Sequence, residues 1–172
     1  MKSLLLRALL AFLALPGTVA FLVPLLLLMP RSFVNRWAVI PLGLGSVLLL
    51  SCVREFYVAG PGTLVPWAPP RNLVVTGPYR FSRNPMYIAV LLVLWGWSLA
   101  FQSRSHATYA AVMTILFHLR VVLFEEPWLD QTHGEEWVRY KAAVSRWFGT
   151  HKQQDARTNT DARRVSTGQP LG

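Results

Sequence analysis

Ionisable side chains are costly in hydrocarbon, so those inside and just after one long apolar run of this sequence are candidates for chemistry. They form two pairs, His118 with Arg120 and Glu125 with Glu126. At about 100° per residue, Thr114, His118 and Glu125 fall within roughly 40° of one another on a helix. We expect these three to form an inward-facing stripe, with Arg120 and Glu126 each pointing elsewhere. Alternatively, the acidic residues only mark the helix end, and His118 bonds a neighbouring backbone group.

The segment TGPYRFSRNPMY, residues 76–87, places polar and turn-forming residues directly before another apolar run. It ends the longest interior connection, which runs from about Gly60 to Asn84 and is rich in Gly and Pro, residues that fix turns. A long loop with so much imposed geometry is more often functional than slack. The alternative is a rigid interfacial connector, in which Trp67 and Tyr79 lie among lipid headgroups.

Apolar residues are abundant and clustered, which indicates an integral membrane protein. The chain of 172 residues is 53% hydrophobic and only 15% charged. Its apolar runs are roughly 20 residues long, about the length that crosses a bilayer as a helix. We therefore predict an all-α membrane protein with about four transmembrane helices, at residues 8–30, 37–53, 85–103 and 106–124.

The first apolar run could also be a cleaved signal peptide. Lys2 precedes it, and the small residues 18–20 resemble a cleavage site. The apolar character continues to Met29, beyond the usual length of such a signal, so we expect a retained helix. Pro16 and Pro24 would kink this helix, and neighbouring helices would then bond the carbonyl groups that the prolines leave free.

The net charge of +9 could indicate nucleic-acid binding, but the distribution of basic residues favours a membrane topology instead. With four spans, the N-terminus, the connection between the second and third spans, and the C-terminal segment share one side. The other side carries only Arg31, Arg36 and Arg104. We therefore predict that both termini are cytoplasmic and that nucleic acid is not a partner.

After the fourth span, residues 135–148 are predicted to form an amphipathic helix in the membrane interface. Its aromatic and apolar residues recur every three or four positions, while basic residues occupy the other faces. The apolar face comprises Trp137, Tyr140, Val144, Trp147 and Phe148. Gly134 offers a break just before this helix. Residues 149–172 are polar and are predicted to be disordered, which leaves a domain of residues 1–148.

Several soluble cofactor and metal sites are absent from the sequence. It has no Gly-x-x-x-x-Gly-Lys phosphate loop, no Gly-x-Gly-x-x-Gly fingerprint, no His-Glu-x-x-His zinc pair and no Gly-x-Ser-x-Gly nucleophile turn. The single cysteine, Cys52, lies in the second apolar run, which excludes a disulfide framework and indicates a buried thiol. A cofactor would have to be bound by helix ends and loops at the membrane surface.

Two segments together resemble a family of membrane enzymes. They are LVVTGPYRFSRNPMYIAV and, after a helical hairpin, FEEPWLDQTHGEEWVRYKAAVSRW. The pattern Gly-x-Tyr, Arg-His-Pro-x-Tyr, Glu-Glu and Gly-Glu-Glu-Tyr-x-x-Tyr is that of the isoprenylcysteine carboxyl methyltransferase and phospholipid methyltransferase group. The chain resembles this pattern from Leu73 to about Phe148, nearly half of its length.

The resemblance implies S-adenosylmethionine as the cofactor, bound at the cytoplasmic face, and a lipophilic acceptor that arrives from the bilayer. Carboxylates suit the ribose hydroxyls or amino group of this cofactor, Arg suits its carboxylate, and aromatic rings suit its sulfonium methyl and adenine. Arg120 is predicted as the catalytic residue that orients an anionic acceptor group. Together with the polar stripe, the resemblance gives the predicted cofactor-binding residues Tyr79, Arg83, Asn84, Pro85, Tyr87, His118, Glu125 and Glu126.

Two positions depart from the family pattern. Asn84 stands where better-known members have histidine, and Trp137 stands in place of the first tyrosine of the last motif. Asn donates and accepts hydrogen bonds but cannot act as a base near neutral pH. We therefore expect the protein to align donor and acceptor rather than to relay a proton.

Two other functions fit part of the sequence. Membrane sterol reductases, which use NADPH, resemble the architecture and share an Arg-x-Pro-x-Tyr-like entrance, but the Glu-Glu pair favours methyl transfer. A non-catalytic scaffold would use the basic interfacial helix to dock lipids or partners. The acceptor and the oligomeric state stay open, because Trp95, Trp97 and Phe101 on the predicted lipid-facing side of the hairpin indicate only an apolar acceptor or tail.

Overall fold

The computed structural model describes residues 13–26, 35–58 and 73–148, and these ranges contain helices and no strand. The predicted all-α class is confirmed for this part of the chain. Parts of the predicted first span and of the Gly60–Asn84 connection, and the whole C-terminal tail, lie outside it. The elements are η1 (Leu13–Leu22, a π-helix), α2 (Val23–Leu26), η2 (Arg36–Ala38), α3 (Val39–Val58), η3 (Gly77–Arg80), α4 (Pro85–Phe101), α5 (Arg104–Arg120), η4 (Val121–Glu125, a π-helix), α6 (Glu126–His133) and α7 (Glu135–Ala143).

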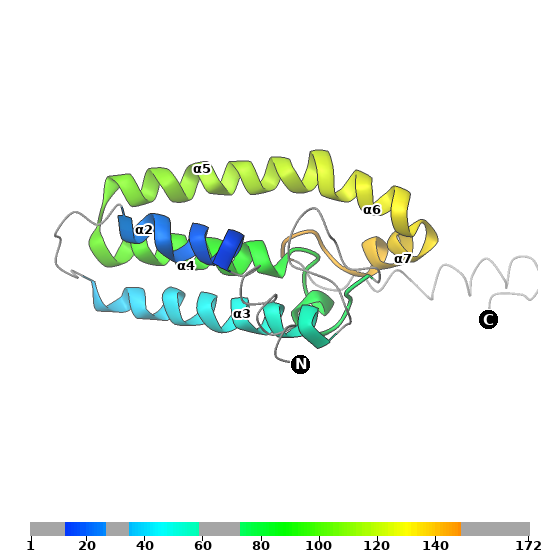
Figure 1. The fold of residues 1–172 in the computed structure, drawn as a ribbon, viewed down its shortest axis with the longest axis horizontal. Helices are drawn as coiled ribbons and strands as arrows, with labels where there is room; N and C mark the ends of the chain where they lie inside the picture. Colours follow the sequence, from blue (N-terminus) through cyan, green and yellow to red (C-terminus); the bar gives the residue numbers. More distant parts are fainter. Residues whose placement is uncertain (1–12, 27–34, 59–72, 149–172) are drawn as a thin grey trace, which may run out of the picture.

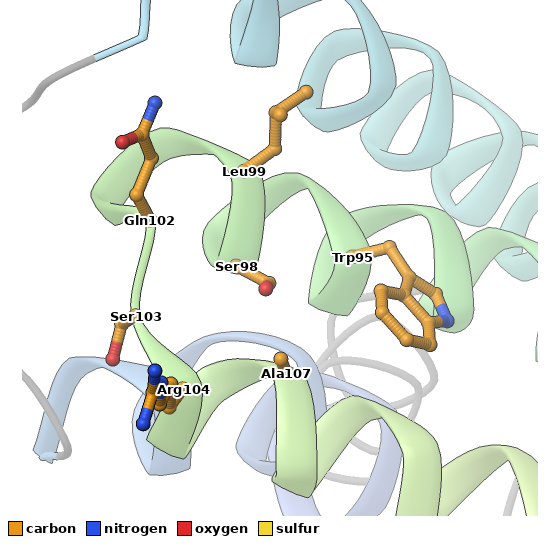
Figure 2. A pocket seen from close by; sticks show the side chains of 7 residues that line it. All are labelled: Trp95, Ser98, Leu99, Gln102, Ser103, Arg104 and Ala107. Atoms are coloured by element: carbon orange, nitrogen blue, oxygen red, sulfur yellow. The ribbon is translucent and has the colours of Figure 1, made fainter.

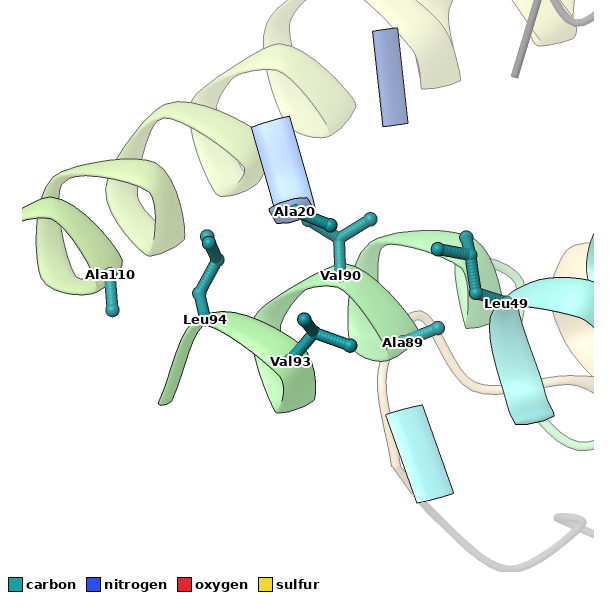
Figure 3. Packing of buried hydrophobic residues seen from close by; sticks show 7 residues of the cluster. All are labelled: Ala20, Leu49, Ala89, Val90, Val93, Leu94 and Ala110. Atoms are coloured by element: carbon teal, nitrogen blue, oxygen red, sulfur yellow. The ribbon is translucent and has the colours of Figure 1, made fainter. Parts of the chain in front are cut away.

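Helix α4 lies at the centre of the fold, between α3 and α5, with η1 and α2 alongside it (Figure 1). Its buried side chains meet those of the neighbouring helices in one apolar cluster (Figure 3). The buried members of this cluster are Ala20, Leu49, Ala89, Val90, Val93, Leu94 and Ala110. The core is therefore built around α4 by small and medium-sized side chains.

Glycine lets α3 approach α4 closely. A Cβ atom on Gly45 would lie 2.8 Å from Ala89 O and from Val93 Cγ2 of α4. In the opposite direction, a Cβ atom on Gly96 of α4 would lie 2.8 Å from Leu42 Cγ of α3. Lipid is as apolar as these side chains, so helices in a bilayer are held together by such close contacts rather than by hydrophobic burial.

Pro24 leaves carbonyl groups free in the first helix, and side chains of other helices bond them. A proline lacks the N–H that would bond Ala20 O in an α-helix or Val19 O in a π-helix. The indole Nε1 of Trp97 on α4 donates to Ala20 O at 3.0 Å. The Tyr109 hydroxyl on α5 donates to Val19 O at 3.3 Å. The expected compensation by neighbouring helices is therefore present at Pro24.

Two helices are long and apolar enough to cross a membrane, Arg36–Glu55 and the continuous helix Arg104–His133. They correspond to the predicted second and fourth spans. The apolar helices at the predicted first and third spans are shorter, Pro16–Leu26 and Pro85–Phe101. The structure thus supports membrane association through two helices of full length.

The α4–α5 hairpin brings distant polar residues to one end of the bundle. Gln102 has φ 45°, in the left-handed region, and Ser103 leads directly into α5. Helix α5 then returns along α4, and its continuation through η4 reaches the level at which α4 begins (Figure 1). The start of α4, the end of the long helix and α7 therefore gather at the same end.

The prediction that Trp95, Trp97 and Phe101 face lipid is wrong for Trp97 and Phe101. Trp97 bonds the first helix and stacks on Phe101, with ring centroids 5.7 Å apart. Only Trp95 is largely exposed, at 46%. The indole N–H of Trp97 has a free carbonyl to bond on the first helix, so this side chain faces protein.

The predicted interfacial helix is shorter than expected, and two side chains of its apolar face are turned inward, while Phe148 is exposed. Helix α7 ends at Ala143 because Val144 is extended, with φ −125° and ψ 133°. Trp137 is 2% exposed and Val144 8%, so both pack against the protein rather than against lipid. Gly134, with φ 48°, separates α6 from α7 as predicted. Amphipathic spacing defines an apolar face, but it does not tell a lipid partner from a protein partner.

Replacing Trp97 by Phe should destabilise the protein, because Ala20 O then loses its hydrogen-bond donor. We expect the free energy of unfolding to fall by about 1 kcal/mol, the typical worth of one such bond. Thermal denaturation in detergent, followed by circular dichroism, measures the change. Trp95→Phe is the matched control on the same helix, and equal stabilities of the two variants would contradict the role of Trp97.

Candidate active site

The entrance to α4 is anchored to the end of α3. Gly77 has φ 57°, and a Cβ atom there would lie 2.7 Å from the Glu55 side chain. The Glu55 carboxylate accepts a hydrogen bond from Thr76 Oγ1 at 2.7 Å. The ring of Tyr79 is buried with Cys52 in a small apolar cluster, which confirms the expected burial of the thiol. The Gly-Pro turn thus fixes the entrance through packing and one carboxylate.

Glu126 is held between two arginines. Arg146 Nε and Nη2 donate to the two Glu126 oxygens, each at 2.7 Å. Arg83 Nη1 lies 3.1 Å from Glu126 Oε1, although the two atoms are not aligned for a hydrogen bond. The side chains of Arg83 and Glu126 are only 9% and 12% exposed. Charges buried this far require partners, because each alone would carry a large desolvation cost.

Arg83 also contacts an aromatic ring and keeps unpaired donors. Its Cζ atom lies 5.3 Å from the centroid of the Trp137 ring, a cation–π distance. Among the described residues, Arg83 Nε and Nη1 and Trp137 Nε1 are buried without a hydrogen-bond partner. Burial lowers the pKa of the Arg83 guanidinium, and the nearby Glu126 carboxylate opposes this shift. Unpaired buried donors of this kind suit an acceptor group on a bound molecule.

Glu125 belongs to a second cluster, with Tyr87 and Arg120. The Tyr87 hydroxyl donates a hydrogen bond to Glu125 Oε1. Arg120 Nε donates to the same carboxylate oxygen at 2.8 Å and to the Tyr87 oxygen at 3.0 Å. The side chains of Arg120 and Glu125 are 45% and 31% exposed, so this ion pair adds little stability and stays accessible to a ligand.

The expectation that Arg120 and Glu125 point in different directions is wrong. It assumed α-helical geometry throughout, whereas the five residues after Arg120 form the π-helix η4. A π-turn bonds residue i to residue i+5, which brings residues five apart onto one face. The predicted stripe is also broken, because Thr114 Oγ1 bonds Ala110 O of its own helix and His118 is exposed.

The remaining predicted residues shape this end of the bundle. Asn84 Nδ2 donates to Arg146 O at 3.0 Å, and the buried Pro85 begins α4. His118 stacks on Trp147, with ring centroids 6.1 Å apart, instead of joining the carboxylates. The ring of Tyr79 lies in the core, and its carbonyl accepts a hydrogen bond from the Tyr140 hydroxyl at 2.7 Å. The predicted residues that meet at this end through side-chain contacts are Arg83, Asn84, Tyr87, Arg120, Glu125 and Glu126.

Sequence reasoning missed Arg146 and Ser82. Arg146 is one of the basic residues expected on the non-aromatic faces of an interfacial helix, yet its side chain binds Glu126, and this bond raises the pKa of its guanidinium. Ser82 Oγ accepts a bond from Asn84 N at 3.1 Å and donates to Arg146 O at 3.2 Å. A carboxylate predicted to lie at the end of an apolar helix needs a cationic partner. This requirement is the feature of the sequence that could have pointed to an arginine such as Arg146.

Surface hollows lie at the opposite end of the bundle. One, of about 330 Å³, adjoins the α4–α5 turn and is lined by Trp95, Ser98, Leu99, Gln102, Ser103, Arg104 and Ala107 (Figure 2). Another, of about 590 Å³, lies between the first helix and α5. Neither hollow is lined by a member of the two carboxylate clusters. We place the candidate site at those clusters, because perturbed and buried charges converge there.

The donor groups of the candidate site are suited to an organic ligand. Within the described residues, no three His, Cys, Asp or Glu side chains are grouped so that they could hold a metal ion. The clusters instead combine two carboxylates, three guanidinium groups and aromatic rings. Such a set can bind hydroxyls, a cation and an anion at once.

Residues 34–136 match the family described as phospholipid methyltransferase. The chain belongs to the phospholipid methyltransferase family. The matched range holds both carboxylates and the entrance to α4, and membership indicates a methyltransferase that acts on a lipid-type acceptor. No curated protein and no solved structure matches the chain.

Replacing Glu126 by Gln should destabilise this family member, because Arg83 then stays buried without a counter-charge. We expect the free energy of unfolding to fall by roughly 2 kcal/mol, less than for a fully buried pair, since Arg146 is 36% exposed. Thermal denaturation in detergent measures the effect. Glu135→Gln, on the exposed surface of α7, is the control. A Glu126→Gln variant as stable as this control would refute the pairing.

Proposed function

We propose that the protein transfers a methyl group from S-adenosylmethionine to a lipophilic acceptor at the cytoplasmic face of a membrane. The observation that carries the proposal is the convergence of Tyr87, Glu125 and Glu126 at one end of the hairpin, inside the family match. Membership in this family favours methyl transfer over the reductase and the scaffold that the sequence also allowed.

The two carboxylates and Arg83 provide the polar recognition in this proposal. Arg83 has open donors for the carboxylate of the cofactor. Glu125 is the better placed of the two acids for a ribose hydroxyl or the amino group, because its side chain is 31% exposed. Both oxygens of Glu126 are already bonded by Arg146, so this acid contributes mainly by holding the arginines.

The other proposed cofactor-binding residues give the site its walls. The Tyr87 ring lies against Phe117, with centroids 4.7 Å apart, and offers an aromatic surface to adenine or to a sulfonium methyl group. Asn84 is the N-cap residue of α4 and Pro85 is its first residue, and Tyr79 supports this helix start from the core. The exposed ring of His118 forms the outer edge of the proposed site.

The residues of this site act by alignment. Bound S-adenosylmethionine supplies a methyl group that is activated by its sulfonium. Methyl transfer is an in-line displacement, so the protein must align the reacting groups and exclude water. The Nε atom of Arg120 stays hydrogen-bonded to Glu125. The rest of its guanidinium orients an anionic group of the acceptor, because the side chain is 45% exposed. Asn84 in place of histidine provides no base at that position.

The proposed arrangement in the membrane follows from charge. The basic residues cluster on the side that holds both termini, which supports a cytoplasmic location for the charged end of the bundle. In this arrangement residues 1–148 form one domain with four spans, and the acceptor reaches Arg120 from the bilayer. Soon after Arg120, the long helix exposes the side chains of Leu123 and Phe124, which suit an apolar acceptor tail.

Glu125→Ala and Tyr87→Phe should each weaken the binding of S-adenosylmethionine. We expect a loss of about tenfold, the approximate worth of one hydrogen bond to a charged group. Calorimetry on folded protein in detergent measures the affinity. Asp130→Ala, which removes an exposed carboxylate from α6, is the matched control. Unchanged affinity in both site variants would remove these residues from the proposed site.

Purified protein, incubated with labelled S-adenosylmethionine and a lipid extract from its host, should produce a labelled lipophilic compound. The acceptor is identified by chromatography and mass spectrometry of that product. With S-adenosylmethionine well below its Kd, Glu125→Ala should produce about one tenth as much, following its expected loss of affinity. If the wild-type protein binds the cofactor and labels nothing in the extract, methyl transfer to a lipid is the wrong function.

A further inference from the structure

Residues 144–147, which we name the C-terminal strap, fold back from α7 onto the entrance of α4. Ser145 O accepts a hydrogen bond from Arg83 N at 2.9 Å. Arg146 O accepts one hydrogen bond from Asn84 Nδ2 at 3.0 Å and another from Ser82 Oγ at 3.2 Å. The strap is therefore fixed by its own backbone to the three residues that precede α4.

This attachment delivers the Arg146 side chain to Glu126. Two parallel bonds of 2.7 Å join Nε and Nη2 to the two carboxylate oxygens. A planar guanidinium that meets both oxygens fixes the rotation of the carboxylate and satisfies its best-aligned acceptor positions. The strap residue Arg146, which lies after the family match, thus controls an acid inside that match.

Because Arg146 bonds both oxygens of Glu126, two donor atoms of Arg83 have no hydrogen-bond acceptor. Its Nη1 atom is 3.1 Å from Glu126, yet Nε and Nη1 form no hydrogen bond within the described part of the chain. The side chain is 9% exposed and lies over Trp137. Buried donors without an acceptor cost free energy, and a carboxylate is the acceptor that guanidinium groups bind best.

We propose that Arg146 is a positioning residue: by taking both oxygens of Glu126, it keeps Arg83 available for the carboxylate of the methyl donor. The inference rests on the proposed function, because it requires S-adenosylmethionine to bind at this end of the bundle. Arg146 itself does not touch the donor. Without Arg146, the Arg83 guanidinium turns to Glu126 and its donors are no longer open.

Substitutions at Arg146 test this role by calorimetry with S-adenosylmethionine. Arg146→Met should weaken binding about tenfold, the worth of a hydrogen bond between charged groups. Arg146→Lys keeps the charge but cannot bond both oxygens in a fork, so its loss should be smaller. Arg139→Met, which removes an exposed cation from α7, is the matched control and should bind like the wild type.

Decarboxylated S-adenosylmethionine separates positioning from a merely structural role. Because this ligand lacks the group that Arg83 binds, it should bind the wild type and Arg146→Met with equal affinity. Equal losses for both ligands, or an unchanged affinity for S-adenosylmethionine, would overturn the inference. If Arg146→Met does not fold, the affinities of Arg146→Lys for the two ligands are compared instead, and the same two outcomes would overturn the inference. A wild-type protein that binds neither ligand would refute the proposed function, and this inference with it.

Discussion

The pairing of buried charge is the constraint on which one whole end of this protein depends. Arg83 and Glu126 lie almost out of contact with solvent at the end of an apolar bundle. Unpaired charges in such a place cost several kcal/mol each, so they must lie together. This requirement joins segments far apart in the chain: the entrance to α4, the start of α6 and the C-terminal strap. The helices provide the scaffold, and the charges decide where the end of the domain attaches to it.

Two consecutive glutamates serve different tasks because a helix turns between them. Successive side chains on a helix point about 100° apart, so Glu125 and Glu126 cannot share one set of partners. Glu126 is buried between arginines, whereas Glu125 stays partly exposed with Tyr87 and Arg120. One acid is suited to hold the architecture, and the other is suited to contact a ligand. The function that we propose uses both, because alignment is useful only if the aligning groups are rigid.

Much of the fold follows from local patterns, and the orientation of its surfaces does not. The apolar runs predict the helices because bilayer thickness sets their length, and Pro24 predicts carbonyl groups that need donors. Trp97 and Trp137 were expected to face lipid, yet both face protein. An aromatic residue at helical spacing indicates an apolar neighbour, and a membrane and a packed helix are equally apolar. Only the arrangement of the other helices decides between them.

The sequence by itself determined which groups could meet. Arg83 and Tyr87 lie at the start of a hairpin of two helices of 17 residues each, and the acids follow the hairpin, so the chain must return to the level at which it began. Tertiary structure decided which of these groups pair. The π-helical turn shifts Arg120 onto the face of Glu125, and the strap brings Arg146 across the chain to Glu126. Neither pairing is present in local periodicity, because the first depends on a change of helical phase and the second on the cost of leaving a buried carboxylate without a cation.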